Sequence, residues 1–390
     1  MNTLDLVILA AMGAAAVGGY RIGFLARVAS WVGLALGIFV AVRLLPTVLR
    51  TFKSPDPANK LLIAAVVLIG GAFAGQALGL VLGSMMGRFI PTGPMLGADR
   101  AVGAVVGALG VLVAVWLLLP AMAEVPGAPA RAARNSAVAR YLDANLPGPP
   151  DALQTLRRLV GANGFPRVFD ALRPSPVTGP PPSSTGLSAV TLGRVGAATV
   201  KVSGQACNRI QEGSGCAVAA DTVVTNAHVV AGERFTEVLR PDGRRMRAFV
   251  TLFDPDRDLA ILSVSGLGEP SLGIGAGREG TNGAVFGHPG GQDQLRVAPA
   301  AVRRRVTAIG RDLYDSHTTK REVFILASDL HPGDSGGALV DTGGTVVGVA
   351  FAIAPDRPGT SYALTSRELT TDLAVRRGGS VSTGPCLSNA

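Results

Sequence analysis

The 390-residue sequence is poor in metal-binding residues and in aromatic side chains that stack on nucleic-acid bases. Its 4 histidines and 3 cysteines do not have the spacing of a metal-ligand set. Aromatic residues make up 5%, and the basic residues behind the formal net charge of +9 form no stripe interleaved with rings. We therefore expect no metal, no cofactor and no nucleic-acid partner, and interpret the charge as contact with anionic lipid headgroups.

The N-terminus also lacks the features of a cleaved signal peptide. Asp5 stands where a basic region would be, and no small-residue cleavage site ends the first apolar segment. Hydrophobic residues nevertheless make up 48% of the chain, and the mean hydropathy is +0.37. Four apolar segments hold this excess: 4–20, 26–45, 61–87 and 101–123. Because a bilayer core of roughly 30 Å needs about 20 apolar residues per helix, we predict a bundle of about four transmembrane helices within residues 1–123.

Glycines recur at four-residue spacing inside these segments. The pairs and triplets are Gly33 with Gly37, Gly71 with Gly75 and Gly79, and Gly103 with Gly107. This spacing places small residues on one helix face and lets two backbones approach closely. The sequence therefore predicts close helix packing.

Residues 124–186 form a linker in which proline clusters alternate with two amphipathic patterns, at 132–146 and 151–172. Proline runs favour an extended, semi-rigid backbone, so we predict a spacer with short helices. Exposed linkers are common sites of proteolytic cutting. We therefore expect self-cleavage between residues 124 and 190 if the chain is a protease.

From residue 187 to 390 short β-branched runs alternate with glycine, proline and Asp or Asn. The runs are AATVKV, GCAVAA, TVVTNAHVV, RAFVTLF, LAILSV, GAVFGH, FILASD, GGALVD, TVVGVAFAI and YALT. Helical periodicity is weak before residue 365. Strands at this spacing predict an all-β domain, and about 200 residues suffice for two small barrels of chymotrypsin type.

Three motifs in this domain supply the groups of a nucleophilic triad. TNAHVV contains His228, DPDRDLAIL contains Asp258, and HPGDSGGALV contains Ser335. A serine hydroxyl needs a base that takes its proton, and an imidazole with a pKa near 6.5 suits that task. A carboxylate fixes the imidazole tautomer, and His, Asp, Ser is a known chain order for such triads.

The glycines around Ser335 predict an oxyanion hole. Gly333 and Ser335 can each aim a backbone N–H at the negative charge that develops on a substrate carbonyl. Asp254 and Asp256 stay open as rivals of Asp258 because they lie in the same loop. The other open interpretation is a membrane transport or scaffold protein whose β domain is regulatory and non-catalytic.

The motifs carry a resemblance to known families. TNAHVV, DRDLAIL and GDSGGALV resemble the catalytic blocks of trypsin-like and HtrA-like serine proteases, while LDLVILA and GYRIGFLARVASWVG are similar to the colicin V production (CvpA) family. Together with the linker, they resemble the actinobacterial membrane-anchored acid-resistance proteases (MarP-like). The resemblance implies a periplasmic serine endopeptidase of envelope stress, with peptide or protein substrates that include cell-wall hydrolases. We expect no HtrA-style peptide-binding module after the protease domain.

The resemblance also bears on orientation. Counting Lys and Arg residues weakly favours a cytoplasmic domain, whereas the resemblance implies an extracytoplasmic one on a multi-pass membrane anchor.

Further residues are assigned with the family in view. Asp329 lies six residues before Ser335, where trypsin-like enzymes carry their specificity acid. Two roles stay open for Asp334: binding a new amino terminus, as the matching acid does in trypsin-like zymogens, or bracing the oxyanion loop. The strand with Val349, Ala350 and Phe351 is expected to pair with an extended substrate.

The three cysteines allow three pairings, and the spacing alone chooses none. Cys216 lies in a strand-like run, whereas Cys207 and Cys386 lie in polar surroundings. In an oxidising compartment we pair Cys207 with Cys386, which the resemblance also implies; three free thiols are the alternative in the cytosol.

Overall fold

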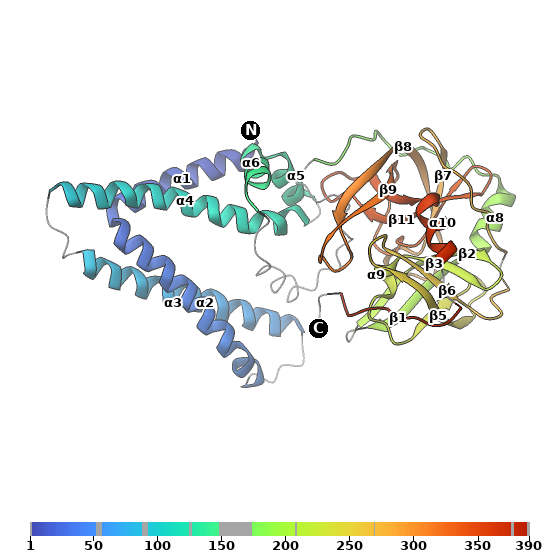
Figure 1. Cartoon of the computed structure of the whole chain (residues 1–390), viewed down its shortest axis with the longest axis horizontal. Coiled ribbons are helices and arrows are strands. Elements are labelled where there is room, and N and C mark those ends of the chain that lie inside the picture. Colours follow the sequence, from blue (N-terminus) through green and yellow to red (C-terminus); the bar gives the residue numbers. More distant parts are fainter. Residues whose placement is uncertain are drawn as a thin grey trace. The chain divides into compact units, whose positions relative to one another are not determined.

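The structure is a computed structural model. It describes residues 2–51, 57–87, 93–124, 127–147, 174–206, 209–268, 270–375 and 378–387. The chain forms two compact units, a helical unit of residues 1–122 and 135–160, and a β unit of residues 123–134 and 161–390 (Figure 1).

Four long helices make up most of the helical unit. They are α1 (Thr3–Ile22), α2 (Phe24–Thr51), α3 (Pro57–Gly87) and α4 (Pro94–Glu124). Each contains a stretch of 20 to 26 residues that is long and apolar enough to cross a membrane, which confirms the prediction of four spans. At the start of α1, Asn2 and Asp5 form a reciprocal capping box that satisfies two orphan N–H groups.

The glycines mark the contacts between these helices. A Cβ on Gly37 would lie 2.1 Å from the carbonyl oxygen of Gly71, and one on Gly33 would lie 2.2 Å from that of Gly75, so α2 and α3 pack backbone to backbone. In α4, a Cβ on Gly107 would lie 2.3 Å from the Ala15 carbonyl oxygen of α1. The predicted close packing at glycine faces is confirmed.

Two short helices follow, α5 (Ala128–Asn135) and α6 (Ala137–Asn145). Asp5 accepts hydrogen bonds from the Ser136 hydroxyl (2.5 Å) and from the Val138 N–H (3.1 Å), so a carboxylate of α1 also caps α6. The residue that argued against a signal peptide thus joins two helices of the helical unit. The amphipathic pattern at 151–172 lies outside the described residues.

The β unit contains two six-stranded closed barrels, as the fold prediction required. The first consists of β1 (Thr199–Ala206), β2 (Arg209–Ala219), β3 (Thr222–Thr225), β4 (Thr236–Leu239), β5 (Arg245–Asp254) and β6 (Leu259–Ser263), in the spatial order β1-β2-β3-β6-β5-β4. All neighbouring strands pair antiparallel, and a closed sheet leaves no long unpaired edge.

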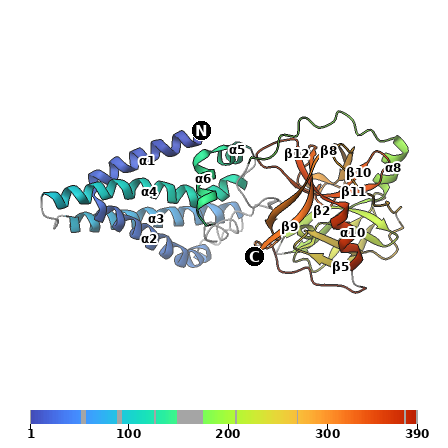
Figure 2. The same cartoon turned by 45° about the horizontal axis from the view of Figure 1, so that its top comes forward.

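The second barrel has the order β10-β11-β12-β9-β8-β7. Its strands are β7 (Asn282–Gly287), β8 (Arg296–Arg311), β9 (Thr318–Ala327), β10 (Ala338–Asp341), β11 (Val346–Ile353) and β12 (Thr360–Thr365). Helix α8 (Ala189–Ala197) precedes the first barrel, and α10 (Ser366–Val375) follows the second and contacts β6 of the first and β11 of the second (Figure 2). The core is apolar, with Leu262, Phe286 and Phe351 fully buried.

The sequence patterns missed two strands and two helices. Strand β4 is only four residues long, and β8 contains Pro299 and three consecutive arginines. The register of β8 against β9 shifts between Val302 and Arg304, which lets adjacent arginines face solvent. The missed helices are α8, before the first strand, and the one-turn helix α9 (Ala227–Val230), in which the motif TNAHVV continues.

Residues before the predicted start of the protease domain at 187 pack on the second barrel. Ser175 donates from its N–H and its hydroxyl to the two carboxylate oxygens of Asp356 (2.9 and 2.5 Å), and Thr178 shares a 2.9 Å hydrogen bond with Thr360. Both contacts lie at the connection between β11 and β12. The end of the linker is therefore part of the β unit.

Candidate active site

His228 and Asp258 meet inside the first barrel. His228 lies on α9, and its Nδ1 is 2.7 Å from Asp258 Oδ2; its backbone N–H donates to Asp258 Oδ1 (2.8 Å). The Asp258 side chain is fully buried, whereas that of His228 is 16% exposed. A carboxylate that contacts one residue twice fixes both the position of the imidazole and its tautomer, with the proton on Nδ1.

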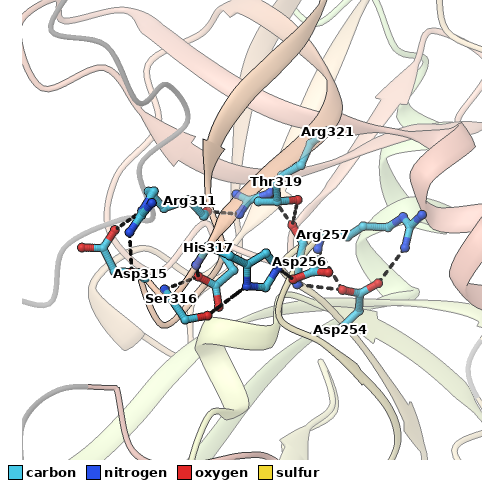
Figure 3. A network of polar contacts seen from close by, with 10 residues as sticks. Asp254, Asp256, Arg257, Arg311, Asp315, Ser316, His317, Thr319 and Arg321 are labelled. Carbon is cyan, nitrogen blue, oxygen red and sulfur yellow. Dashed lines mark hydrogen bonds and ion pairs between the residues drawn. The ribbon is translucent and has the colours of Figure 1, made fainter. Parts of the chain in front are cut away.

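The rival aspartates of the same loop are engaged elsewhere. Asp254 pairs with Arg257 (2.8 Å), and Asp256 Oδ1 lies 2.9 Å from Nε2 of His317 (Figure 3). The geometry thus selects Asp258 from the three candidates.

The loop that carries Ser335 has a backbone that only glycine accommodates. Gly333 has a φ of 100° and Gly336 one of 85°, a region that side chains disfavour. A Cβ on Gly333 would lie 2.5 Å from the His288 carbonyl oxygen, and one on Gly336 would lie 2.0 Å from that of Ser214. The GDSGG motif is therefore required both for the turn and for the close approach of neighbouring chains.

Ser214, on β2 of the first barrel, ties the nucleophile loop in place. Its N–H donates to the Ser335 carbonyl (2.8 Å), and its hydroxyl donates to the Gly333 carbonyl (2.7 Å) while accepting from the His288 N–H (2.8 Å). Sequence reasoning missed this residue. Its signal was GSGC, where flanking glycines indicate close approach of another backbone.

Strand β2 also brings the base and the nucleophile loop to the same place. A Cβ on Gly213 would lie 2.6 Å from the side chain of Val229, the neighbour of His228, and 3.2 Å from the Ser335 carbonyl oxygen. Strand β2 thus packs against both the neighbour of His228 and the backbone of Ser335.

Arg296, at the start of β8, braces the oxyanion loop from the side. Its Nη1 donates to the Asp329 carbonyl (2.9 Å) and to His331 Nδ1 (2.6 Å), and lies 3.5 Å from Asp334 Oδ2. Burial raises the pKa of Asp334, and its bond from the His331 N–H and the charge of Arg296 oppose that rise. Of the two roles that the sequence left open for Asp334, these contacts favour bracing of the loop.

The structure places the predicted specificity acid, Asp329, and the predicted substrate strand in different surroundings. The Asp329 side chain is 60% exposed and lies 3.5 Å from Arg296 Nη2, so its charge is already countered. On β11, Ala350 binds the nucleophile loop through both its C=O and its N–H, and Val349 lies between Ala338 and Leu364 in the sheet. The backbone groups of Val349 and Ala350 are therefore not available to pair with a substrate. The pairing of β11 with β10 ends before Phe351.

One group in the described residues has the chemistry of metal ligands. Asp256, Asp312 and His317 bring one ligand atom each within 4.8 Å of one another, a proximity that their sequence separation conceals. Asp312 already accepts from the Ser316 N–H (2.5 Å) and hydroxyl (2.7 Å), and His317 pairs with Asp256. These contacts occupy the would-be ligand atoms within the loop network.

Comparison with known proteins decides the family. A trypsin-like peptidase domain model matches residues 213–349, and a colicin V production protein model matches residues 4–147. Serine protease Rv3671c of Mycobacterium tuberculosis is 31% identical over 395 residues, which cover 99% of this chain and 98% of that protein. The chain belongs to the Rv3671c serine protease family.

The solved structures agree with this membership. The crystal structure of the active form of the Rv3671c protease matches with a TM-score of 0.50 and 33% identity over 55% of this chain and 98% of that chain. The serine protease Do-like HtrA of Lactococcus lactis is 29% identical over 143 residues, 33% of this chain and 32% of that protein. Like its Rv3671c relative, the chain is a serine endopeptidase, and its CvpA-like helical part makes it a multi-pass membrane protein. The predicted MarP-like resemblance is confirmed.

Proposed function

We propose that the chain hydrolyses peptide bonds of proteins through a triad of His228, Asp258 and Ser335. The observation that carries this proposal is the 2.7 Å contact between His228 Nδ1 and the buried Asp258 carboxylate. The Ser335 hydroxyl attacks the substrate carbonyl while His228 Nε2 takes its proton, and Asp258 stabilises the imidazolium. The imidazolium then gives the proton to the leaving amine, and water repeats the cycle to release the acyl group.

The remaining parts of the site bind the substrate. The N–H groups of Gly333 and Ser335 stabilise the negative oxygen of the tetrahedral intermediate, an interaction worth roughly 3 kcal/mol per donor. The edge of β11 after Ala350, from Phe351 to Ile353, where pairing with β10 has ended, pairs with an extended peptide. Because Arg296 counters the charge of Asp329, that acid selects no basic side chain.

We place the β unit outside the cytoplasm, where the enzyme acts in envelope stress such as acid exposure on protein substrates that include cell-wall hydrolases. Membership in the Rv3671c family supports this role. An extracytoplasmic position also fits a disulfide between Cys207 and Cys386. Cys216 is a free, buried thiol, and Cys386 is disulfide-bonded, whereas Cys207 lies outside the described residues.

The pairing would hold the C-terminal tail on the first barrel. Gly232 donates from its N–H to the Thr383 carbonyl (3.0 Å), and a Cβ on Gly232 would lie 3.2 Å from Cys386 Sγ. Val381 likewise donates to the Val250 carbonyl (2.8 Å). The disulfide would therefore secure a tail that lies next to the helix of His228.

A fluorophosphonate probe tests the triad directly. We expect the full-length protein in detergent to be labelled at Ser335, because only a serine activated by a base attacks such a probe rapidly. Peptide mapping identifies the labelled residue, and Ser335→Ala is expected to remove the label. A folded, unlabelled parent protein would instead favour a scaffold with a regulatory β domain.

Self-cleavage between residues 124 and 190 is the second expected outcome. The unaltered full-length protein should release a fragment of the β unit on incubation, and Ser335→Ala should stay intact. Cleavage in trans is separated by mixing the two proteins, with the altered chain carrying a tag. Identical intact bands in both samples would argue against self-cleavage.

A further inference from the structure

The backbone of Asp258 requires support from outside its own loop. Its φ is 61°, in the left-handed region that residues other than glycine seldom adopt, and its side chain is fully buried. Such a conformation persists only where surrounding contacts impose it. Within the first barrel, Asn226 Nδ2 donates to the Asp258 carbonyl (2.8 Å).

Further contacts reach this loop from the hairpin of β8 and β9 in the second barrel. The Leu313 N–H donates to the Pro255 carbonyl (2.9 Å), and the Thr319 hydroxyl donates to the Asp256 carbonyl (3.1 Å). Arg321 Nε donates to the same Asp256 carbonyl (2.6 Å; Figure 3). The carbonyls two and three residues before Asp258 are thus held by a different barrel.

Arg321 differs from the other two donors because it carries a buried charge. The residue is only 2% exposed, and its Nη2 donates to the Arg311 carbonyl, which anchors it to its own hairpin. Burial lowers the pKa of Arg321, while the nearby carboxylates oppose that shift; Asp258 is the first of them, followed by Asp254, Asp256 and Asp312. The guanidinium therefore lies close to the carboxylate of Asp258.

One part of Arg321 is left unsatisfied. Its Nη1 is buried and has no hydrogen-bond partner among the described residues. A buried, unpaired polar nitrogen opposes folding. A buried arginine that carries this penalty and whose Nε donates to the loop of the acid points to a role beyond packing.

We propose that Arg321 is a positioning residue for the triad. It holds the Asp256 carbonyl and places a cation near Asp258, so that the carboxylate stays aligned with His228 Nδ1. The proposal rests on the proposed catalytic role of Asp258.

Arg321→Met in the full-length protein tests the proposal. We expect kcat on a fluorogenic peptide to fall about tenfold at an unchanged KM, because the substitution displaces Asp258 but not the edge of β11 that binds the substrate. Arg321→Lys keeps the charge but not the fork, and is expected to lose only about threefold. Arg304→Met removes an exposed arginine of β8 and should leave kcat unchanged; an equal loss there would overturn the proposal.

A double-mutant cycle separates positioning from general destabilisation. In an Asp258→Asn background, Arg321→Met should slow fluorophosphonate labelling by less than about twofold, because the carboxylate through which Arg321 acts is already missing. An equal tenfold loss in both backgrounds, or full kcat in folded Arg321→Met, would overturn the proposal. If Arg321→Met does not fold, the same cycle is measured with Arg321→Lys. Full kcat in Arg321→Lys, or an equal loss of labelling in the parent and Asp258→Asn backgrounds, would reject the positioning role. Absence of labelling in the parent protein would reject the triad itself.

Discussion

Replacing Asp258 by asparagine is expected to lower kcat by about 10⁴-fold while the protein stays folded. The reason lies in the two contacts of this carboxylate. The His228 N–H needs an acceptor at Oδ1, so the new amide would keep its oxygen there and turn its NH₂ toward His228 Nδ1. The imidazole must then accept at Nδ1 and carry its proton on Nε2, the atom that has to take the proton of Ser335.

The measurement is kcat on a fluorogenic peptide, with the KM recorded beside it. Asp256→Asn is the matched control, because Asp256 lies in the same loop but contributes to its position through its backbone carbonyl. We expect that control to keep activity within about threefold. Substantial activity in folded Asp258→Asn, or an equal loss in Asp256→Asn, would show that the acid of the triad has been assigned wrongly.

The sequence could propose a triad because each of its members lies in a short local motif. Glycines that shape the loop are adjacent to Ser335, and His228 follows a strand within the same motif. The choice of Asp258 over Asp254 and Asp256 needed the structure, since all three lie within one turn region and only side-chain direction separates them.

The limits of sequence reasoning have physical causes. Val349 and Ala350 look like an edge strand in sequence, but strand neighbours decide which backbone groups are free, and those neighbours come from distant residues. Strand β8 was missed because Pro299 and an arginine triplet break the expected pattern, and the register shift that accommodates the arginines is set by β9. Arg321 lies 63 residues from Asp258 along the chain, so no local pattern reveals its role.

A second large effect is expected from pH, through the buried carboxyl group of Glu233. This residue follows the helix of His228: its N–H donates to the Val230 carbonyl (3.2 Å), and it is only 6% exposed. Burial raises the pKa of Glu233 from 4.5 to about 8, although hydrogen bonds from Thr236 and Gln211 oppose the rise. The neutral form is therefore the one that the folded protein accommodates.

The sign of the effect follows from proton binding. Below pH 4.5 the carboxyl group is protonated in both states and folding carries no penalty from it. Between pH 4.5 and about 8 the unfolded chain ionises while the folded protein keeps its proton, so the free energy of unfolding falls as the pH rises. At about 1.4 kcal/mol per pKa unit, the loss amounts to roughly 5 kcal/mol by pH 8.

Glu233→Gln is expected to remove this loss. Its free energy of unfolding should match that of the parent near pH 4.5 and exceed it by several kcal/mol at pH 8, measured by urea unfolding with pulse proteolysis of the β unit. Glu237→Gln, at an exposed glutamate of β4, should follow the parent at both pH values. A Glu233→Gln difference of equal size at both pH values would mean that ionisation of this group is not the cause. A group that stabilises the first barrel more in acid, next to the helix of His228, would suit the role in acid stress that we propose.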